Sequence, residues 1–348
     1  MKSYILACIA CIVGATLIYI LVTPDPIATG QRAAFERMND DEEAAEGYIY
    51  ETDAESAEDC SSYEAYDEER GVCYFECEDE EECASIEAEI DDELGALAGE
   101  YAQSDDAFAE SDAGDGPAVV ATYKVTSPER ITLTDGDADV RHREIWNLFA
   151  RISPDAFTDA YVNTYEIADD ASDDTLAYVH DEDGDGYWSV GVNIGSFGTE
   201  GKREDILTLI HEFAHIVTLN QTQVVHGGTC ITYDTGDGCA TAQSYLHAFV
   251  KQFWPESERR QAVSGENIYE RAPQKYLTEY AATSPEEDIA ESFALFVLES
   301  KRREGTTIAD QKASFFYAYP ELVTLRNSIR KGLGSILLER KRMTVENN

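Results

Sequence analysis

The chain has 348 residues, with 26 Lys and Arg against 70 Asp and Glu, which gives a formal net charge of −44. So large an excess of acid makes nucleic acid a poor partner, because two anionic surfaces repel each other. The length allows one large domain or two ordinary ones.

The first residues predict a targeting segment. Residues 4–22 form a run of 19 uncharged, mostly apolar residues, about enough to cross a bilayer as a helix. The end of the run offers no good small-x-small cleavage site, which favours an uncleaved signal anchor over a cleaved signal peptide. We therefore interpret residues 1–23 as an anchor, or as a signal peptide, with the rest of the chain outside the cell.

Residues 24–116 have the composition of a spacer. From residue 31 to residue 116 there are 32 Asp and Glu against three Arg, and few large apolar side chains. This pattern predicts a self-repelling segment that is largely extended or disordered, with a possible helix over residues 76–97. A domain boundary is expected at residue 117.

Six of the eight cysteines lie outside the apolar run and fall into two local groups. An even number of cysteines in an exported chain predicts disulfides, among them Cys230–Cys239 in a Gly-rich loop. The other group is Cys60, Cys73, Cys77 and Cys83, whose pairing stays open. Zinc binding by this group is the alternative, but its spacing lacks paired C-x-x-C motifs.

Residues 117–348 predict an α+β domain with a small mixed sheet. Strands are expected at residues 118–126, 160–167, 175–180 and 187–194, and a helix at 141–152. The last two strands form a hairpin around a turn from Asp181 through Asp183 and Asp185 to Gly186. This turn matches the first half of a Ca²⁺-binding EF-hand loop, but Val192 stands where the bidentate Glu belongs. A plain turn is therefore favoured over a Ca²⁺ site.

The second half of this domain predicts a series of helices. The first, at residues 202–220, is apolar on almost every side and should be buried. A helix at 286–303 has clear start signals in Ser284 and Pro285. Further helices are expected at residues 244–254, 308–317 and 321–342.

The buried helix carries His-Glu-x-x-His. Residues four apart share one helix face, so His211 and His215 can bind one metal ion through two imidazole nitrogens. Glu212 stands beside them, where it can deprotonate a metal-bound water. Catalytic zinc keeps one open position and needs a third protein ligand.

That third ligand is not the histidine of the metzincin pattern, because Thr218 and Gln221 stand at the required Gly and His positions. Glu287 and Glu291 lie one turn apart on the later helix, so one can bind the metal while the other orients a ligand histidine. His226, in the Gly-rich loop, is the alternative ligand.

His211-Glu-Phe-Ala-His215, Tyr280, Glu287 and Glu291 together resemble the gluzincin zinc metallopeptidases, particularly the anthrax lethal factor-like branch. The chain is also similar to bacterial surface proteins described as zinc metallopeptidases. The resemblance implies a zincin-like fold and one catalytic Zn²⁺ held by His211, His215 and Glu287. It further implies that Glu291 orients a ligand histidine without binding the metal itself, and that Tyr280 stabilises the transition state.

The resulting hypothesis is a membrane-anchored, extracellular zinc metalloendopeptidase, bacterial and monomeric, acting on peptide or protein substrates. Strand 188–194 is the expected edge on which an extended substrate could pair. The alternative is a surface binding or adhesion protein whose zinc site is structural.

Overall fold

The structure is a computed structural model, which describes residues 34, 35, 38, 50–53, 65–68, 72–75, 80–101, 117–128, 130–181, 186–198, 202–227 and 229–346. Within these residues, no helix combines the length and apolarity that crossing a membrane requires. The predicted anchor and most of the predicted spacer lie outside the described residues, as do Asp183 and Asp185 of the acidic turn. Nothing is described of the side chains of the four-cysteine group.

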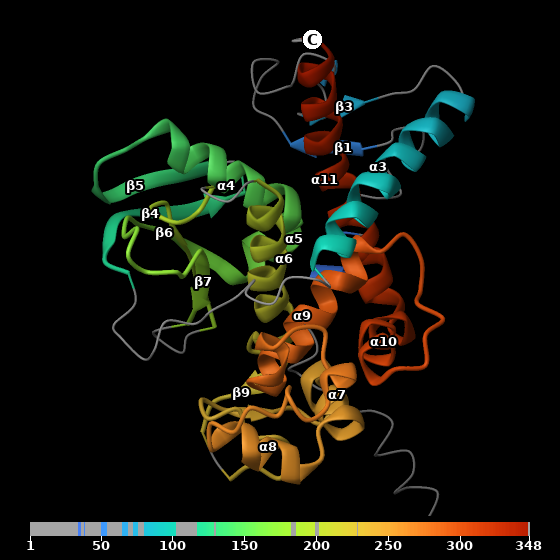
Figure 1. Ribbon diagram of the computed structural model, residues 1–348. Coiled ribbons are helices and arrows are strands. Elements are labelled where there is room, and N and C mark those ends of the chain that lie inside the picture. The colour runs from blue at the N-terminus through green and yellow to red at the C-terminus, as the bar shows by residue number, and fades with distance from the viewer. Residues whose placement is uncertain are drawn as a thin grey trace, which may run out of the picture.

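A five-stranded mixed sheet has the strand order β5-β4-β6-β8-β7 (Figure 1). Its strands are β4 (Val119–Ser127), β5 (Arg130–Gly136), β6 (Val162–Ala168), β7 (Ala177–His180) and β8 (Trp188–Asn193). β6 and β8 run parallel, and the other neighbouring pairs are antiparallel. The chain is therefore α+β, as its pattern predicts.

The hairpin expected from the acidic turn is present, because β7 pairs antiparallel with β8 and Val179 lies opposite Val190. The prediction that residues 188–194 form a sheet edge is wrong. β8 lies between β6 and β7, and the short β7 is the edge strand on that side. Val190 and Val192 are fully buried, as befits an interior strand.

Three helices precede or follow these strands and cover one face of the sheet: α4 (Val140–Ile152), α5 (Asp155–Tyr161) and α6 (Lys202–Leu219). α4 begins where the Asp139 side chain accepts the Arg141 N–H. Its buried Trp146 packs on Tyr165 of β6, with ring centroids 5.1 Å apart. Phe213 of α6 meets Phe149 and Phe157, which fixes α6 against α4 and α5.

The rest of the domain is mainly helical and lies on the far side of α6 from the sheet (Figure 1). The helices are α7 (Tyr245–Phe253), α8 (Glu256–Val263), α9 (Pro285–Leu298), α10 (Ile308–Ala313) and α11 (Pro320–Glu346). Short 3-10 turns occur at η1 (Pro273–Lys275), η2 (Tyr280–Ala282) and η3 (Phe315–Ala318), and β9 (Val224–Val225) pairs with β10 (Cys239–Ala240). α6 and α9 are in direct contact.

Both ends of α9 have identifiable causes. At its start the Ser284 hydroxyl accepts the Glu287 N–H, as the sequence predicts. The helix ends at Leu298, short of the expected residue 303. Arg326 and Arg330 of α11 donate to the last carbonyls of α9, and cations at a helix C-terminus are favourable.

A helix from the acidic segment joins this arrangement. α3 (Glu80–Tyr101) confirms the helix expected there, and it contacts α11 (Figure 1). Its buried side chains are apolar, and Asp91 forms an ion pair with Arg330. A Cβ at Gly334 would stand 2.6 Å from Ile90, so glycine permits the close approach of α3 and α11. A small sheet, β1 (Tyr50–Asp53), β3 (Val72–Phe75) and β2 (Ala65–Asp67), completes the described part.

Candidate metal centre

The two histidines of α6 and one glutamate of α9 converge on a single point. The Nε2 atoms of His211 and His215 lie 3.0 Å apart. Glu287 Oε2 is 3.0 Å from the first of these nitrogens and 3.4 Å from the second. Within the described part of the chain, these three residues are the group of side chains placed to hold a metal ion.

The donor atoms fit zinc in kind and in spacing. Zinc takes imidazole nitrogen and carboxylate oxygen at about 2.0–2.2 Å in a tetrahedral arrangement, which separates neighbouring ligand atoms by about 3.3 Å. The three observed separations, 3.0, 3.0 and 3.4 Å, agree with that spacing. Three protein ligands leave the fourth position for water or substrate, as in catalytic rather than structural sites.

The charges around these ligands favour a cation. Burial alone would lower the pKa of His211, but the carboxylates of Glu287 and Glu291 raise it to about 10. Burial opposes ionisation of Glu287, yet the nearby charge of His215 and the hydrogen bonds of both histidines lower its pKa well below the ordinary range. The site therefore stabilises an ionised carboxylate and positive charge in a buried place, which is the setting that a divalent cation requires.

Glu291 stands behind His211, one helical turn beyond Glu287. Its Oε1 lies 3.2 Å from His211 Nδ1, on the opposite side of the ring from the ligand nitrogen. A carboxylate at that nitrogen is the usual partner of a metal-ligating histidine, because it fixes the tautomer and the ring orientation. The structure thus separates the two glutamates: Glu287 faces the convergence point, and Glu291 faces the far side of His211.

The two remaining predicted residues lie next to the ligands. Glu212 follows His211 on α6 and is largely buried. Tyr280 opens η2, and the centroid of its ring is 5.8 Å from that of His211. α6 thus carries Glu212 next to a candidate ligand in the sequence, and the turn before α9 brings the Tyr280 ring near the same histidine.

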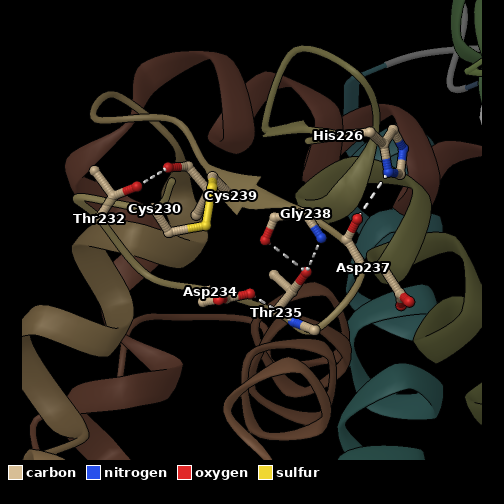
Figure 2. The surroundings of a disulfide bond; sticks show 10 residues. His226, Cys230, Thr232, Asp234, Thr235, Asp237, Gly238 and Cys239 are labelled. Carbon is tan, nitrogen blue, oxygen red and sulfur yellow. Dashed lines mark hydrogen bonds between the residues drawn. A yellow bond between two sulfur atoms is a disulfide. The ribbon is translucent and has the colours of Figure 1, made fainter. Parts of the chain in front are cut away.

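The alternative ligand, His226, is not part of this group. It belongs to the loop that follows α6, where its Nδ1 lies 3.0 Å from the Asp237 carbonyl oxygen (Figure 2). The same figure shows the predicted disulfide between Cys230 and Cys239, whose Cα atoms are 5.3 Å apart. A disulfide is typical of proteins in an oxidising, extracellular or periplasmic compartment.

The loop closed by this disulfide also reaches α9. Tyr233, which lies between the two cysteines, donates a hydrogen bond of 3.1 Å from its hydroxyl to Glu286, the neighbour of the candidate ligand Glu287. Nothing in the sequence marks this tyrosine among the 20 of the chain.

A second buried cluster lies at the start of α9. Asp288 Oδ2 accepts a hydrogen bond of 2.6 Å from Trp254 Nε1 and forms an ion pair of 2.5 Å with Lys312 of α10. The ammonium of Lys312 also lies 4.0 Å from the ring centroid of Tyr276. Sequence reasoning missed this cluster, although a lysine between Ala309 and Ala313 on an otherwise buried helix face is a usable signal.

The acidic turn between β7 and β8 is described only at its ends. Asp181 Oδ2 accepts the Gly186 N–H at 3.1 Å, which is the hydrogen bonding of a turn. The Ca²⁺ alternative at Asp181–Asp185 stays untested, because the residues between lie outside the described part.

Fold and site together define an α+β protein with a buried His-His-Glu group that can bind a metal ion such as zinc, in the HExxH arrangement of the zincins. Comparison of the chain with protein-family models, with curated proteins and with solved structures finds no match in any of the three.

Proposed function

We propose that this protein is a zinc-dependent metalloendopeptidase of the gluzincin type. The observation that carries the proposal is the convergence of His211, His215 and Glu287, with Glu212 on the same helix as the histidines. Three protein ligands together with an adjacent carboxylate are the parts that metal-assisted hydrolysis needs.

The chain's own residues divide the chemistry of peptide hydrolysis among them. Zinc held by the three ligands would polarise the scissile carbonyl and acidify the attacking water. Glu212 accepts the proton of that water and returns it to the leaving amine. The Tyr280 hydroxyl donates a hydrogen bond to the carbonyl oxygen as negative charge develops on it. Glu291 holds the His211 ring in its ligating orientation.

The edge strand β7 supports a way of binding an extended substrate. β7 pairs with β8 along one side and is the last strand of the sheet on the other. It also contacts α6, the helix that carries the metal ligands. A peptide added to that edge as a further antiparallel or parallel strand would lie along the metal site, held by main-chain hydrogen bonds.

The disulfide and the apolar run of residues 4–22 support a place at the cell surface. In this proposal the first 23 residues anchor the chain. Residues 117–348, the metal domain, act outside the cell as a monomer, and their substrate is a peptide or protein. The net charge of −44 argues against nucleic acid.

Replacing the proposed general base tests the function. The variant Glu212→Gln should bind one zinc per chain with little change and lose cleavage of an unbiased peptide library by at least about 100-fold, the lower end for general-base catalysis. Elemental analysis measures the zinc and mass spectrometry the cleaved peptides. Glu270→Gln, at an exposed position, serves as the matched control.

Two outcomes would overturn the proposal. One is wild-type cleavage by Glu212→Gln. The other is a full-length wild-type chain that binds one zinc tightly and cleaves no peptide, which would favour a binding protein with a structural zinc site.

A further inference from the structure

One buried hydroxyl lies between the metal site and the turn that carries Tyr280. Thr278 is 4% exposed and lies in the connection just before η2. Its Oγ1 is 3.0 Å from Glu291 Oε2 and 3.0 Å from the backbone nitrogen of Ala281. A side chain from a loop thus contacts both α9 and the start of η2.

The direction of these two hydrogen bonds follows from their chemistry. An ionised carboxylate only accepts and a backbone N–H only donates, whereas a hydroxyl does both. Thr278 therefore gives its one proton to Glu291 and accepts the Ala281 N–H on a lone pair. One hydroxyl therefore makes both hydrogen bonds at once. A rotation of the Thr278 side chain that improved one bond would weaken the other.

The bond to Glu291 extends to the metal ligands. Glu291 is fully buried, with Oε2 on Thr278 and Oε1 3.2 Å from His211 Nδ1. Since one oxygen is held by the hydroxyl, the rotation of the carboxylate is restricted, which keeps its other oxygen within 3.2 Å of His211 Nδ1. The orientation of the His211 ring thereby depends on Thr278 through Glu291.

The bond to Ala281 extends to the proposed oxyanion donor. Tyr280 precedes Ala281 in η2, a turn of three residues with few hydrogen bonds of its own. Anchoring the Ala281 N–H fixes the backbone immediately after Tyr280. The tyrosine ring then stays near His211, at the observed centroid distance of 5.8 Å.

We propose that Thr278 is a positioning residue that couples the two halves of the site, the orientation of His211 through Glu291 and the placement of Tyr280 through Ala281. The first half concerns metal binding alone, and the second rests on the proposed peptidase function. Partners of metal-ligating histidines matter for both metal affinity and activity, and Thr278 stands one step behind such a partner.

The test uses the full-length chain with four single variants. Thr278→Val removes the hydroxyl at nearly constant shape, Thr278→Ala removes it with less bulk, and Thr278→Ser keeps it. Thr158→Val is the matched control. Thr158 lies on α5 and is also buried, and its hydroxyl also hydrogen-bonds, to the hydroxyl and the carbonyl oxygen of Ser153. Chelator competition measures zinc affinity, thermal unfolding measures folding, and steady-state cleavage gives kcat and KM.

Thr278→Val and Thr278→Ala should weaken zinc binding by about tenfold, the low end for partners of ligating histidines. They should lower kcat further while KM changes by less than about twofold, because positioning of Tyr280 acts on the transition state. Thr278→Ser should restore both. Thr158→Val should lower thermal stability without weakening zinc binding.

Double-mutant cycles separate positioning from general destabilisation. In a Glu291→Gln background, Thr278→Val should weaken zinc binding by little more, since its effect passes through Glu291. In a Tyr280→Phe background, its additional loss in kcat should shrink in the same way. Additive effects in both cycles, or wild-type zinc affinity and kcat in a folded Thr278→Val or Thr278→Ala chain, would overturn the proposal.

The outcome also distinguishes this inference from the proposed function. If the wild-type chain binds zinc and cleaves no peptide, the peptidase proposal fails, while the zinc cycle between Thr278 and Glu291 still decides the first half. If cleavage occurs and the Thr278 variants behave like Thr158→Val, only the positioning role fails.

Discussion

Glu286 and Glu287 are neighbours in sequence with opposite surroundings. Burial raises the pKa of Glu286, whose carboxylate accepts the Tyr233 hydroxyl. Glu287 lies against both histidines, which lower its pKa. The surroundings therefore distinguish the candidate ligand Glu287 from its neighbour Glu286.

We expect Glu287→Gln to weaken zinc binding by at least about 100-fold, because the substitution removes an anionic ligand. Losing a ligand should cost more than losing a residue that only hydrogen-bonds to a ligand. Chelator competition measures the change. Glu286→Gln is the control and should stay within about threefold of wild type. Equal losses in the two variants would contradict the assignment of Glu287 as the ligand.

At the residue scale, the sequence identifies the candidate ligands of α6 more directly than the candidate ligand of α9. His211 and His215 are four apart, so helical geometry alone brings their nitrogens together. Glu287 is 76 positions from His211, and only the contact between α6 and α9 decides which glutamate faces the metal. Residue spacing left Glu287 and Glu291 open, and the resemblance to gluzincins chose between them. Thr278 was not foreseen, because a threonine in a loop carries no pattern.

The start of α9 shows how an element is held in place by one buried ion pair. Asp288 and Lys312 are both about fully buried, at 0% and 1% side-chain exposure, and join α9 to α10. We expect Lys312→Met to lower the free energy of unfolding by about 3–5 kcal/mol, because it leaves a buried carboxylate without its counter-charge. Urea unfolding measures the loss.

Two comparisons control this prediction. The double variant Asp288→Asn with Lys312→Met removes both charges and should recover most of the lost stability. Lys275→Met breaks the partly exposed ion pair with Glu258 and should cost less than about 1 kcal/mol. A loss in Lys312→Met no larger than that of Lys275→Met would show that the buried pair does not hold α9.

The edge strand β7 is linked to β6 by a carboxylate that bridges over β8. Glu166 of β6 lies 3.1 Å from His180 Nε2 and accepts the Tyr178 hydroxyl at 3.2 Å. The hydrogen bond with His180 is the main cause of the lowered pKa of Glu166. A carboxyl whose pKa is lower in the folded chain stabilises it above the unfolded pKa, near 4.5, and loses that contribution as the pH falls through the folded value.

Glu166→Gln should therefore lower the free energy of unfolding at pH 7 by about 1 kcal/mol, the usual size for one hydrogen bond. The difference from wild type should shrink as the pH falls below 4.5, because protonated Glu166 resembles the glutamine. Urea unfolding at pH 7, 5 and about 3.5 measures it, with exposed Glu270→Gln as control. A difference that fails to shrink between pH 5 and about 3.5 would contradict the linkage.

At the element scale, alternation and helix caps predicted most of the elements that carry the site. The hairpin, α4, α6 and α7 appear where their patterns place them, and α9 begins where expected but ends short of residue 303. β5 and α5 were not expected. α8 occupies residues where a polar connection was expected. Because α8 buries no side chain, its sequence shows no periodic pattern of apolar residues. The position of β8 inside the sheet was missed, since strand order is set by contacts distant in sequence.

At the scale of the whole molecule, the acidic composition of residues 24–116 does not predict the packing of α3. Ile86, Ile90, Leu94 and Leu97 recur at helical spacing and are buried among many exposed acidic residues. α3 contacts α6, α9 and α11, and Arg330 joins Asp91 of α3 to the last carbonyls of α9. The helix therefore packs on α6 and α9, the elements that carry the candidate metal ligands, which average charge could not show.

Two aspartates placed two positions apart on α3 test this packing. Leu94 is fully buried, whereas Ala96 is exposed on the same helix. Leu94→Asp should lower the free energy of unfolding of the metal domain by more than about 3 kcal/mol, because it removes a core side chain and buries a charge. Ala96→Asp adds the same charge with only its small helix-propensity cost, about 0.7 kcal/mol. Thermal unfolding with and without zinc compares the two, since zinc bound to the folded state raises the unfolding temperature. If the two variants unfold alike, with the same zinc-dependent rise, α3 contributes no stability to the metal domain; a lower transition in Leu94→Asp alone means that the acidic segment and the metal domain fold as one unit.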